Sequence, residues 1–204
     1  RSIAMRSAPA LKPCTFSALM KMKRSPSARQ WSWIGCQNAG SGVLLMGAAG
    51  LVLFPGAGSG ADHPSLLAIE VAVAPLPVSR VDFAYRTAGR RFPDRAPKLI
   101  AEVAEAVEAA AASWNTEASR LVIGGRSMGG RMASMAVAEG TVNAAGLVLV
   151  SYPLHPPKKP ETLRTAHLGQ VAVPTLFVSG DLDAFGTPAE LRAAHALVGG
   201  PVSV

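Results

Sequence analysis

The sequence predicts an α/β protein with a doubly wound, mostly parallel sheet, and two observations carry this prediction. From residue 43 onward, short apolar runs alternate with longer segments that favour helix. This is the order of strand–helix–strand units in a parallel sheet. The apolar runs are almost continuous rather than alternating with polar residues, as expected of strands buried on both faces.

Each expected element follows from its own residues. Pro64 stands in the first turn of an expected helix, where its missing N–H leaves no hydrogen bond unmade. Six alanines between residues 104 and 112 favour the longest helix, and Thr187 is a suitable N-cap for the last one. In chain order we expect strand Leu51–Phe54, helix Pro64–Ala74, strand Val78–Phe83, helix Pro97–Trp114, strand Leu121–Gly124, helix Gly129–Glu139, strands Ala145–Ser151 and Val173–Ser179, and helix Pro188–Val198.

Charge is unevenly distributed along the 204 residues, whose net charge is +7. Seven Lys and Arg residues precede residue 30, and no acidic residue precedes Asp62, so the remainder holds 13 basic and 13 acidic residues. A basic tail on a neutral domain does not argue for nucleic-acid binding, which would need a basic face on the fold itself. The longest apolar run, residues 43–54, is too short to span a bilayer. We therefore expect neither nucleic acid nor a membrane as a partner.

The composition divides the chain into two parts. We expect residues 1–42 to be a basic, disordered extension and residues 43–204 to be the α/β domain. An Arg- and Ser-rich, acid-poor N-terminus is also typical of an organelle transit peptide, and sequence that is not native coding is a further alternative. Cys14 and Cys36 match no metal or redox spacing. Two cysteines make no disulfide framework, which favours a reducing, cytoplasmic location.

The segment Gly125-Arg126-Ser127-Met128-Gly129 has a Gly-x-Ser-x-Gly pattern between an apolar run and a helix-forming run. In this context the serine lies on a sharp turn at the end of a strand, at the positive end of a helix. The two glycines avoid collisions where the chain bends back. The pattern predicts Ser127 as a nucleophile and the N–H of Met128 as a donor to an oxyanion. A glycine-rich helix start that only permits close packing is the alternative.

A second glycine-rich segment, Gly56-Ala57-Gly58-Ser59-Gly60, follows the first expected strand. Its backbone N–H groups can approach an anion closely, which makes the region of Ala57 the natural source of a second oxyanion donor. No Gly-Lys-Ser/Thr follows, so the segment is not a Walker motif. It also lacks the full spacing of a dinucleotide-binding loop.

A nucleophilic serine needs a base and an acid that orients the base. Asp183, in the loop after the last apolar run, is the expected acid, with Asp181 as an alternative and a simple Asp-rich turn as another. The four histidines are His63, His155, His167 and His195. None follows the last expected helix, where the usual chain order of serine, acid and histidine would place the base.

Three residues are expected to contact the substrate. Arg86 belongs to a cluster with Arg90, Arg91 and Arg95 that could bind a carboxylate or phosphate, although a solvated loop is the simpler interpretation. Arg126 adjoins the expected nucleophile, and His155 lies at a strand end from which it could reach the site.

Together these segments resemble the α/β-hydrolase fold in its small dienelactone-hydrolase-like group. The match is closest to a branch of predicted hydrolases that also includes a non-catalytic-looking subunit of a histone-acetyltransferase complex. The resemblance covers residues 50–204 and is specific because separate motifs agree in order. These motifs are Pro55–Ser59, Asp62–Pro64, Asp82–Arg86, Gly89–Arg95, Gly125–Arg131, Ser151–Pro157 and Gly180–Gly186.

The resemblance implies a serine hydrolase with Ser127 as nucleophile and Asp183 as acid, acting on a small ester or thioester without metal or organic cofactor. Pro55-Gly56 stands where the wider fold often has His-Gly. The family's base lies in a turn after one further strand. We therefore expect a fragment that lacks its last strand and its histidine loop and is nearly inactive. A non-catalytic binding or scaffold protein is the alternative, and acyl transfer to an acceptor other than water is a third. No oligomeric state is predicted.

Overall fold

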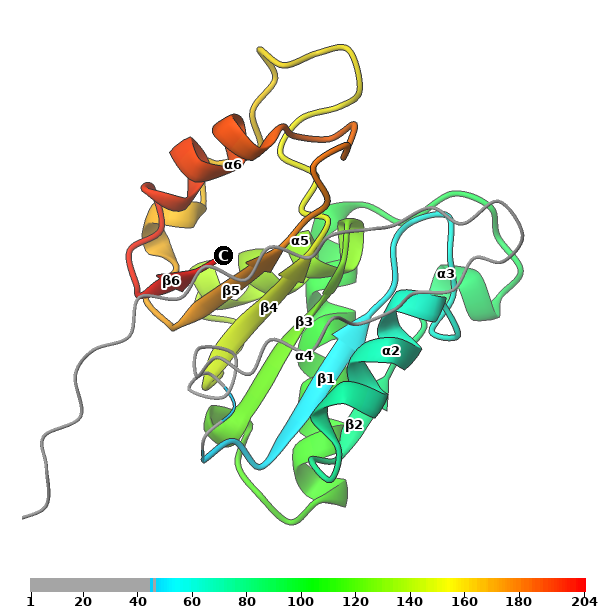
Figure 1. The fold of residues 1–204 in the computed structure, drawn as a ribbon. Helices are drawn as coiled ribbons and strands as arrows, with labels where there is room; N and C mark the ends of the chain where they lie inside the picture. Colours follow the sequence, from blue (N-terminus) through cyan, green and yellow to red (C-terminus); the bar gives the residue numbers. More distant parts are fainter. Residues whose placement is uncertain (1–44, 46) are drawn as a thin grey trace, which may run out of the picture.

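Six strands form a single sheet in the computed structural model, which describes Leu45 and residues 47–204. All neighbouring strands are parallel, in the order β2-β1-β3-β4-β5-β6 (Figure 1). The winding reverses between β1 and β3, because the chain first moves outward to β2 and then returns to the other side of β1. The strands are β1 Gly50–Phe54, β2 Val78–Arg80, β3 Leu121–Arg126, β4 Gly146–Val150, β5 Thr175–Val178 and β6 Val202–Ser203.

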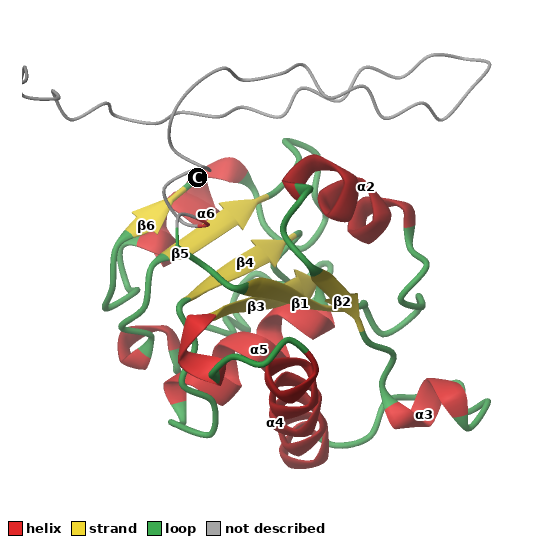
Figure 2. Cartoon of the chain, turned by 90° about the horizontal axis from the view of Figure 1, so that it is seen from below, coloured by secondary structure: helices red, strands yellow, loops and turns green. Residues whose placement is uncertain are grey.

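Helices cover both faces of this sheet, which confirms the predicted doubly wound class. Helix α2 lies on one face and α4 and α5 lie on the other (Figure 2). The α2 side buries Leu51, Leu53 and Leu66, whereas the larger cluster on the opposite side includes Phe54, Ile123 and residues of α4, α5 and α6. The helices are α2 Pro64–Val73, α3 Ala84–Thr87, α4 Ala96–Ser113, α5 Met128–Ala138 and α6 Pro188–His195, with short 3-10 turns at Ala118–Arg120 and Leu168–Gln170.

Most elements differ from their expected bounds by one or two residues at an end, but two of them, β2 and α6, end three residues earlier than expected. The strand expected over 78–83 ends at Arg80, since the carboxylate of Asp82 turns back to accept a hydrogen bond from the N–H of Ala61 at 2.9 Å. Phe83 then precedes α3 as its N-cap residue. The last helix ends at His195 rather than Val198. The residues that follow form hydrogen bonds across three residues instead of the four of an α-helix, for example from the N–H of Leu197 to the carbonyl of Ala194.

The edge after β5 carries only two residues of a sixth strand. This strand, β6, pairs in parallel with β5. The basic extension expected over residues 1–42 lies outside the described residues. Within the part of the chain that is described, no helix is long and apolar enough to cross a membrane.

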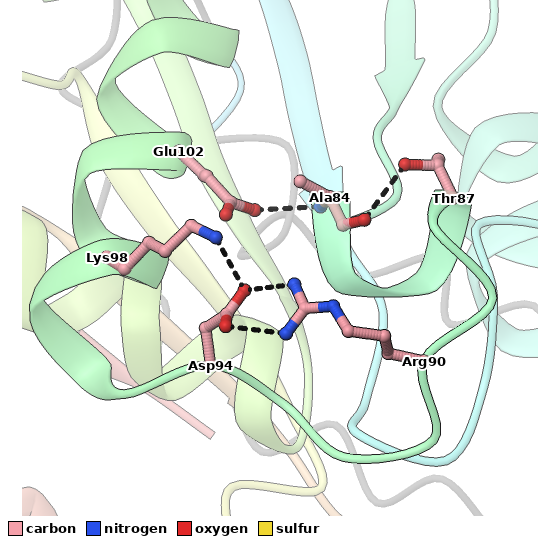
Figure 3. A network of polar contacts seen from close by, with 6 residues as sticks. All are labelled: Ala84, Thr87, Arg90, Asp94, Lys98 and Glu102. Carbon is pink, nitrogen blue, oxygen red and sulfur yellow. Dashed lines mark hydrogen bonds and ion pairs between the residues drawn. The ribbon is translucent and has the colours of Figure 1, made fainter.

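Charged side chains fix the connection between α3 and α4 (Figure 3). Arg90 donates two hydrogen bonds of 2.7 Å to Asp94, and Lys98 donates one of 2.9 Å to the same carboxylate. These contacts hold the pKa of Asp94 far below its usual range. Glu102 on α4 accepts a hydrogen bond of 2.9 Å from the N–H of Ala84, which ties the start of α3 to α4. Arg90, a member of the predicted arginine cluster, therefore has a structural role.

Candidate functional site

The glycine-rich segments both leave the sheet at the point where its winding reverses. Residues 56–60 follow β1 and Ser127 follows β3, and these two strands are direct neighbours. Because the strands are parallel, their carboxyl ends meet at one edge of the sheet. In open α/β sheets, ligands bind outside the carboxyl ends at this reversal. The fold therefore brings the two predicted catalytic segments to a favourable place for a site.

Ser127 occupies a strained bend between β3 and α5. Its φ of 50° and ψ of −116° lie in a region that residues other than glycine rarely adopt. The bend is held on both sides, since its N–H donates to the carbonyl of Val150 at 2.8 Å and its own carbonyl accepts from Arg131 N–H at 3.0 Å. The serine hydroxyl makes no capping hydrogen bond to the helix. The side chain is partly exposed.

The glycines around Ser127 are required by close backbone approach. A Cβ on Gly125 would lie 2.1 Å from the carbonyl oxygen of Phe54, and one on Gly129 would lie 2.3 Å from the same oxygen. A Cβ on Gly130 would come within 2.6 Å of the carbonyl oxygen of Gly125. Real Cβ atoms do not approach so closely, so any side chain at these positions would displace β1 or the start of α5.

The loop after β1 lies directly beside the serine. A Cβ built on Gly56 would be 3.5 Å from the Cβ of Ser127. The loop is shaped by a turn from Ser59 N–H to the carbonyl of Gly56 at 3.1 Å. The buried hydroxyl of Tyr85 donates a hydrogen bond of 2.9 Å to the carbonyl of Ala57. This bond fixes the orientation of the backbone at Ala57.

Two backbone donors remain available next to Ser127. Met128 is the first residue of α5, so its N–H has no partner within the helix. Neither this N–H nor that of Ala57 donates a hydrogen bond to any residue in the described part of the chain. Unpaired N–H groups at a helix start favour negative charge. The start of α5 therefore favours negative charge close to Ser127.

Asp183 lies at the same edge of the sheet, in the loop after β5. Its carboxylate is partly buried and accepts a hydrogen bond of 3.0 Å from the N–H of Phe185, whereas Asp181 is exposed. Strand β5 is two positions from β3, a separation of about 10 Å at the usual strand spacing.

Three of the four histidines are engaged elsewhere. The ring of His195 is buried and stacks on Phe177 with 4.2 Å between centroids. His167 has its Nε2 2.8 Å from the hydroxyl of Ser134. Burial lowers the pKa of both His167 and His195 to about 4. His155 is buried, with Nδ1 2.9 Å from the carbonyl of Pro156 and Nε2 3.6 Å from the carboxylate of Glu190 on α6.

His63 is the remaining histidine and lies on the loop side of the site. It caps α2, and its Nδ1 accepts a hydrogen bond of 3.2 Å from the N–H of Ser65. The neutral ring therefore carries its hydrogen on Nε2, which cannot then accept a proton from a serine. Burial, with a smaller effect from Arg126, lowers the pKa of His63. No histidine is thus held as a base for Ser127 in this geometry.

The three residues expected to contact a substrate occupy different places. One guanidinium nitrogen of Arg126 would be 3.2 Å from a Cβ on Gly56, so this side chain borders the loop and the serine. Arg86 is exposed and approaches Gly60 at the outer end of the same loop. His155 faces α6 rather than open space. Its role in substrate binding stays a prediction, and the structure gives its side chain another partner.

Sequence reasoning missed two residues whose side chains hold the loop after β1 in place. Tyr85 and Asp82 bind the loop through the carbonyl of Ala57 and the N–H of Ala61. The signal was present, because Asp82–Arg86 is a distinct motif at the carboxyl end of a strand beside β1. Among the described residues, no group of three or more His, Cys, Asp or Glu side chains is placed to hold a metal ion.

The chain is similar to known proteins over most of its described length. Residues 47–199 match the model of a family described as an alpha/beta hydrolase domain. A dienelactone hydrolase from Anabaena variabilis ATCC 29413 has a TM-score of 0.54 and 22% sequence identity, with 76% of this chain and 74% of that chain covered.

Two further solved structures have the same fold. The type II thioesterase BorB from the borrelidin biosynthetic cluster has a TM-score of 0.55 and 16% identity, with 76% of this chain and 82% of that chain covered. Est1E from Butyrivibrio proteoclasticus, solved with ferulic acid, has a TM-score of 0.55 and 15% identity, with 76% of this chain and 79% of that chain covered. At these identities the three structures support the fold alone.

Proposed function

This chain belongs to the α/β-hydrolase domain family, and on that premise we propose that it is a serine hydrolase acting on a small ester or thioester. The observation that carries the proposal is the strained bend at Ser127, whose hydroxyl is uncapped beside two unpaired backbone N–H groups. Strain of this kind is retained where the surrounding structure holds it, and it concentrates at active sites.

The proposed reaction proceeds through an acyl-enzyme. The oxygen of Ser127 attacks the carbonyl carbon of the substrate, and the carbonyl oxygen becomes an oxyanion that the N–H groups of Met128 and Ala57 stabilise. Collapse of this intermediate expels the alcohol or thiol and leaves the acyl group on Ser127, from which water releases it. One such donor contributes about 10²–10³-fold to the rate in a known hydrolase.

The proton of Ser127 needs an acceptor, and Asp183 is proposed to orient that acceptor. The four histidines have other partners, so we expect this chain to react slowly by itself. Without its base, a serine hydrolase retains only about 10³–10⁴-fold catalysis over water from its oxyanion donors and from binding. Exogenous imidazole should supply the missing base and raise the rate.

The test is the hydrolysis of p-nitrophenyl butyrate with and without added imidazole, corrected for the uncatalysed rate. Ser127→Ala should lose the enzymatic rate in both conditions. Ser151→Ala is the matched control, because Ser151 also has a positive φ, of 48°, at the end of a neighbouring strand. Equal rates for the wild type and Ser127→Ala would refute the assignment.

A binding or scaffold protein is the second candidate. The observation that favours it is that each of the four histidines has another partner and none is held as a base for Ser127. One fold hosts many functions, so the fold does not separate the two candidates. A chain that shows no Ser127-dependent turnover even with imidazole would support this second function. A cytoplasmic location, suggested by the cysteine usage, is part of the proposal.

A further inference from the structure

His155 is a buried histidine to which the proposed reaction gives no role. It lies in the segment after β4 and is 6% exposed. Its Nδ1 is 2.9 Å from the carbonyl oxygen of Pro156, and a carbonyl only accepts hydrogen bonds, so Nδ1 carries a hydrogen. Its Nε2 is also buried but has no hydrogen-bond partner. The group that faces Nε2 is the carboxylate of Glu190 on α6, at 3.6 Å, which exceeds the distance of a hydrogen bond.

Thr187 fixes the carboxylate oxygen of Glu190 that faces His155. This oxygen accepts a hydrogen bond of 2.7 Å from the Thr187 hydroxyl and one of 2.8 Å from the Thr187 N–H. Both bonds lower the pKa of Glu190, and His155 adds a smaller effect in the same direction. Glu190 is therefore ionised near pH 7 and can only accept hydrogen bonds. An Nε2 without a hydrogen is an acceptor too, so the two groups attract each other only when Nε2 carries a proton.

The segment after β4 is also bonded to the loop that carries Asp183, and the two lie side by side in Figure 1. The N–H of His155 donates to the carbonyl of Phe185 at 3.1 Å. The N–H of Phe185 in turn donates to the carboxylate of Asp183 at 3.0 Å. The segments also meet at Gly186, where a Cβ would lie only 3.2 Å from the Cβ of Leu154. A displacement of His155 therefore moves the peptide that holds the carboxylate of Asp183.

Three segments around His155 carry charged or titratable side chains. They are Glu190 and Arg192 on α6, Asp181 and Asp183 in the loop after β5, and Tyr152, Lys158, Lys159, Glu161 and Arg164 in the segment after β4. In the described part of the chain, Glu190 forms the ion-pair contact with His155. Tyr152 and Arg164 contact backbone carbonyls, the carboxylate of Asp183 accepts a backbone N–H, and the others are exposed. Glu190 is therefore the group that stabilises a proton on Nε2.

We propose that His155 is a positioning residue for Asp183 and acts through a proton-dependent ion pair with Glu190. When Nε2 gains a proton, it donates to Glu190 and closes a ring of contacts through Phe185 and Thr187. When Nε2 has no hydrogen, two acceptors face each other and the loop that carries Asp183 is held less firmly. An imidazole gains this proton in mildly acidic solution. The inference rests on the proposed hydrolase function, in which Asp183 orients the base.

The first experiment measures amide hydrogen exchange by NMR at about pH 5.5 and at about pH 7.5, with rates corrected for the intrinsic effect of pH on exchange. We expect the N–H of Phe185, which binds Asp183, to be protected roughly 10-fold more at the lower pH, as for an opposite charge that shifts a protonation equilibrium by one unit. Glu190→Gln should abolish this difference, although glutamine can still cap α6. His155→Gln should retain the protection at both pH values, because its amide donates to Glu190 without titrating.

His195→Leu is the matched control, because it removes the other buried histidine that contacts α6 or belongs to it, and His195 stacks on Phe177 instead. This variant should leave the pH difference at Phe185 unchanged. His155→Leu should lose the protection at both pH values, and Glu190→Gln carries the test if that variant fails to fold. No pH difference in the wild type, or an equal difference in Glu190→Gln, would overturn the proposal.

The second experiment asks whether His155 acts through Asp183. Imidazole-dependent hydrolysis of p-nitrophenyl butyrate is measured at about pH 6.5, after subtraction of the Ser127→Ala rate. His155→Leu should reduce this rate by roughly 10-fold, since a small misplacement of a catalytic group is costly, and His155→Gln should restore it. In a chain with Asp183→Asn, His155→Leu should have little further effect. Additive losses would overturn the positioning role. Rates equal to those of Ser127→Ala would instead refute the hydrolase assignment, while the exchange rates still test the ion pair.

Discussion

At the scale of single residues, the site depends on glycines at positions where no side chain would fit. The bend at Ser127 brings α5 very close to β1. A Cβ atom at Gly125 or at Gly129 would collide with the backbone oxygen of Phe54. The Gly-x-Ser-x-Gly pattern predicted this bend correctly. It did not predict that Gly130 is also required, which follows from the tight approach to Gly125.

A substitution at Gly129 tests this close approach. We expect Gly129→Ala to reduce the free energy of unfolding by roughly 3 kcal/mol or more, because its Cβ would lie 2.3 Å from a carbonyl oxygen that only movement of β1 could relieve. Gly58→Ala is the control, since nothing lies within 4 Å of its Cβ, and it should change stability by less than about 0.5 kcal/mol. Urea unfolding measures both, and equal midpoints for the two variants would contradict the account.

At the scale of elements, α6 illustrates how a local signal fixes a boundary. Thr187 was predicted as its N-cap, and the structure adds a reciprocal bond from the N–H of Thr187 to Glu190 at 2.8 Å. The Thr187 hydroxyl in turn accepts from the N–H of Glu190 at 3.3 Å. The hydroxyl of Thr187 also donates to the carboxylate of Glu190 at 2.7 Å. This bond and, to a lesser extent, the bond from the Thr187 N–H lower the pKa of Glu190 and orient the carboxylate that His155 faces.

Removing this cap should therefore destabilise α6. We expect Thr187→Ala to cost about 1 kcal/mol of unfolding free energy, the usual effect of losing a threonine N-cap. Thr162→Ala is the control, because that exposed hydroxyl has only a 3.5 Å contact with Glu161. Thermal unfolding of the two variants measures the difference. No loss in Thr187→Ala relative to Thr162→Ala would mean that the cap is not formed in solution.

Helix starts and buried strands were predictable because capping residues, prolines and apolar runs act locally. The ends of helices and strands were not predictable where they depend on tertiary contacts. The strand after Val78 stops early because Asp82 bonds to Ala61, which lies 21 positions earlier in the chain. The partners of the four histidines were also beyond sequence reasoning, since His167 meets Ser134 only when the loop after β4 folds onto α5.

At the scale of the whole molecule, buried neutral histidines make stability depend on pH. The pKa values of His167 and His195 are about 4 in the folded chain, against about 6.5 when unfolded. At pH values between these two pKa values, the unfolded chain binds more protons than the folded chain. The contribution of these two histidines to stability is therefore fully present above about pH 6.5 and is lost as the pH falls toward about 4.

We expect the unfolding free energy to decrease as the pH is lowered from 7 to 5, when it is followed by urea titration at each pH. His195→Leu should weaken this dependence by about one proton's contribution, because leucine can pack against Phe177 without a titratable group. A steeper pH dependence in His195→Leu, or none in the wild type, would show that these rings are not buried as neutral groups.

The doubly wound parallel sheet was predictable, because strands that alternate with helices form parallel sheets with helices on both faces. The strand order was not predicted. The support of the loop after β1 by Tyr85 was not predictable, since Tyr85 lies 28 positions after Ala57 and their hydrogen bond forms only when α3 packs against that loop.

The central claim is that the hydroxyl of Ser127 is the nucleophile. Its most direct test is tandem mass spectrometry of the chain after prolonged reaction with an alkyl fluorophosphonate in the presence of imidazole. The account predicts one covalent adduct, on the peptide that contains Ser127. An adduct confined to another serine, or none under conditions that label an authentic serine hydrolase, would contradict it.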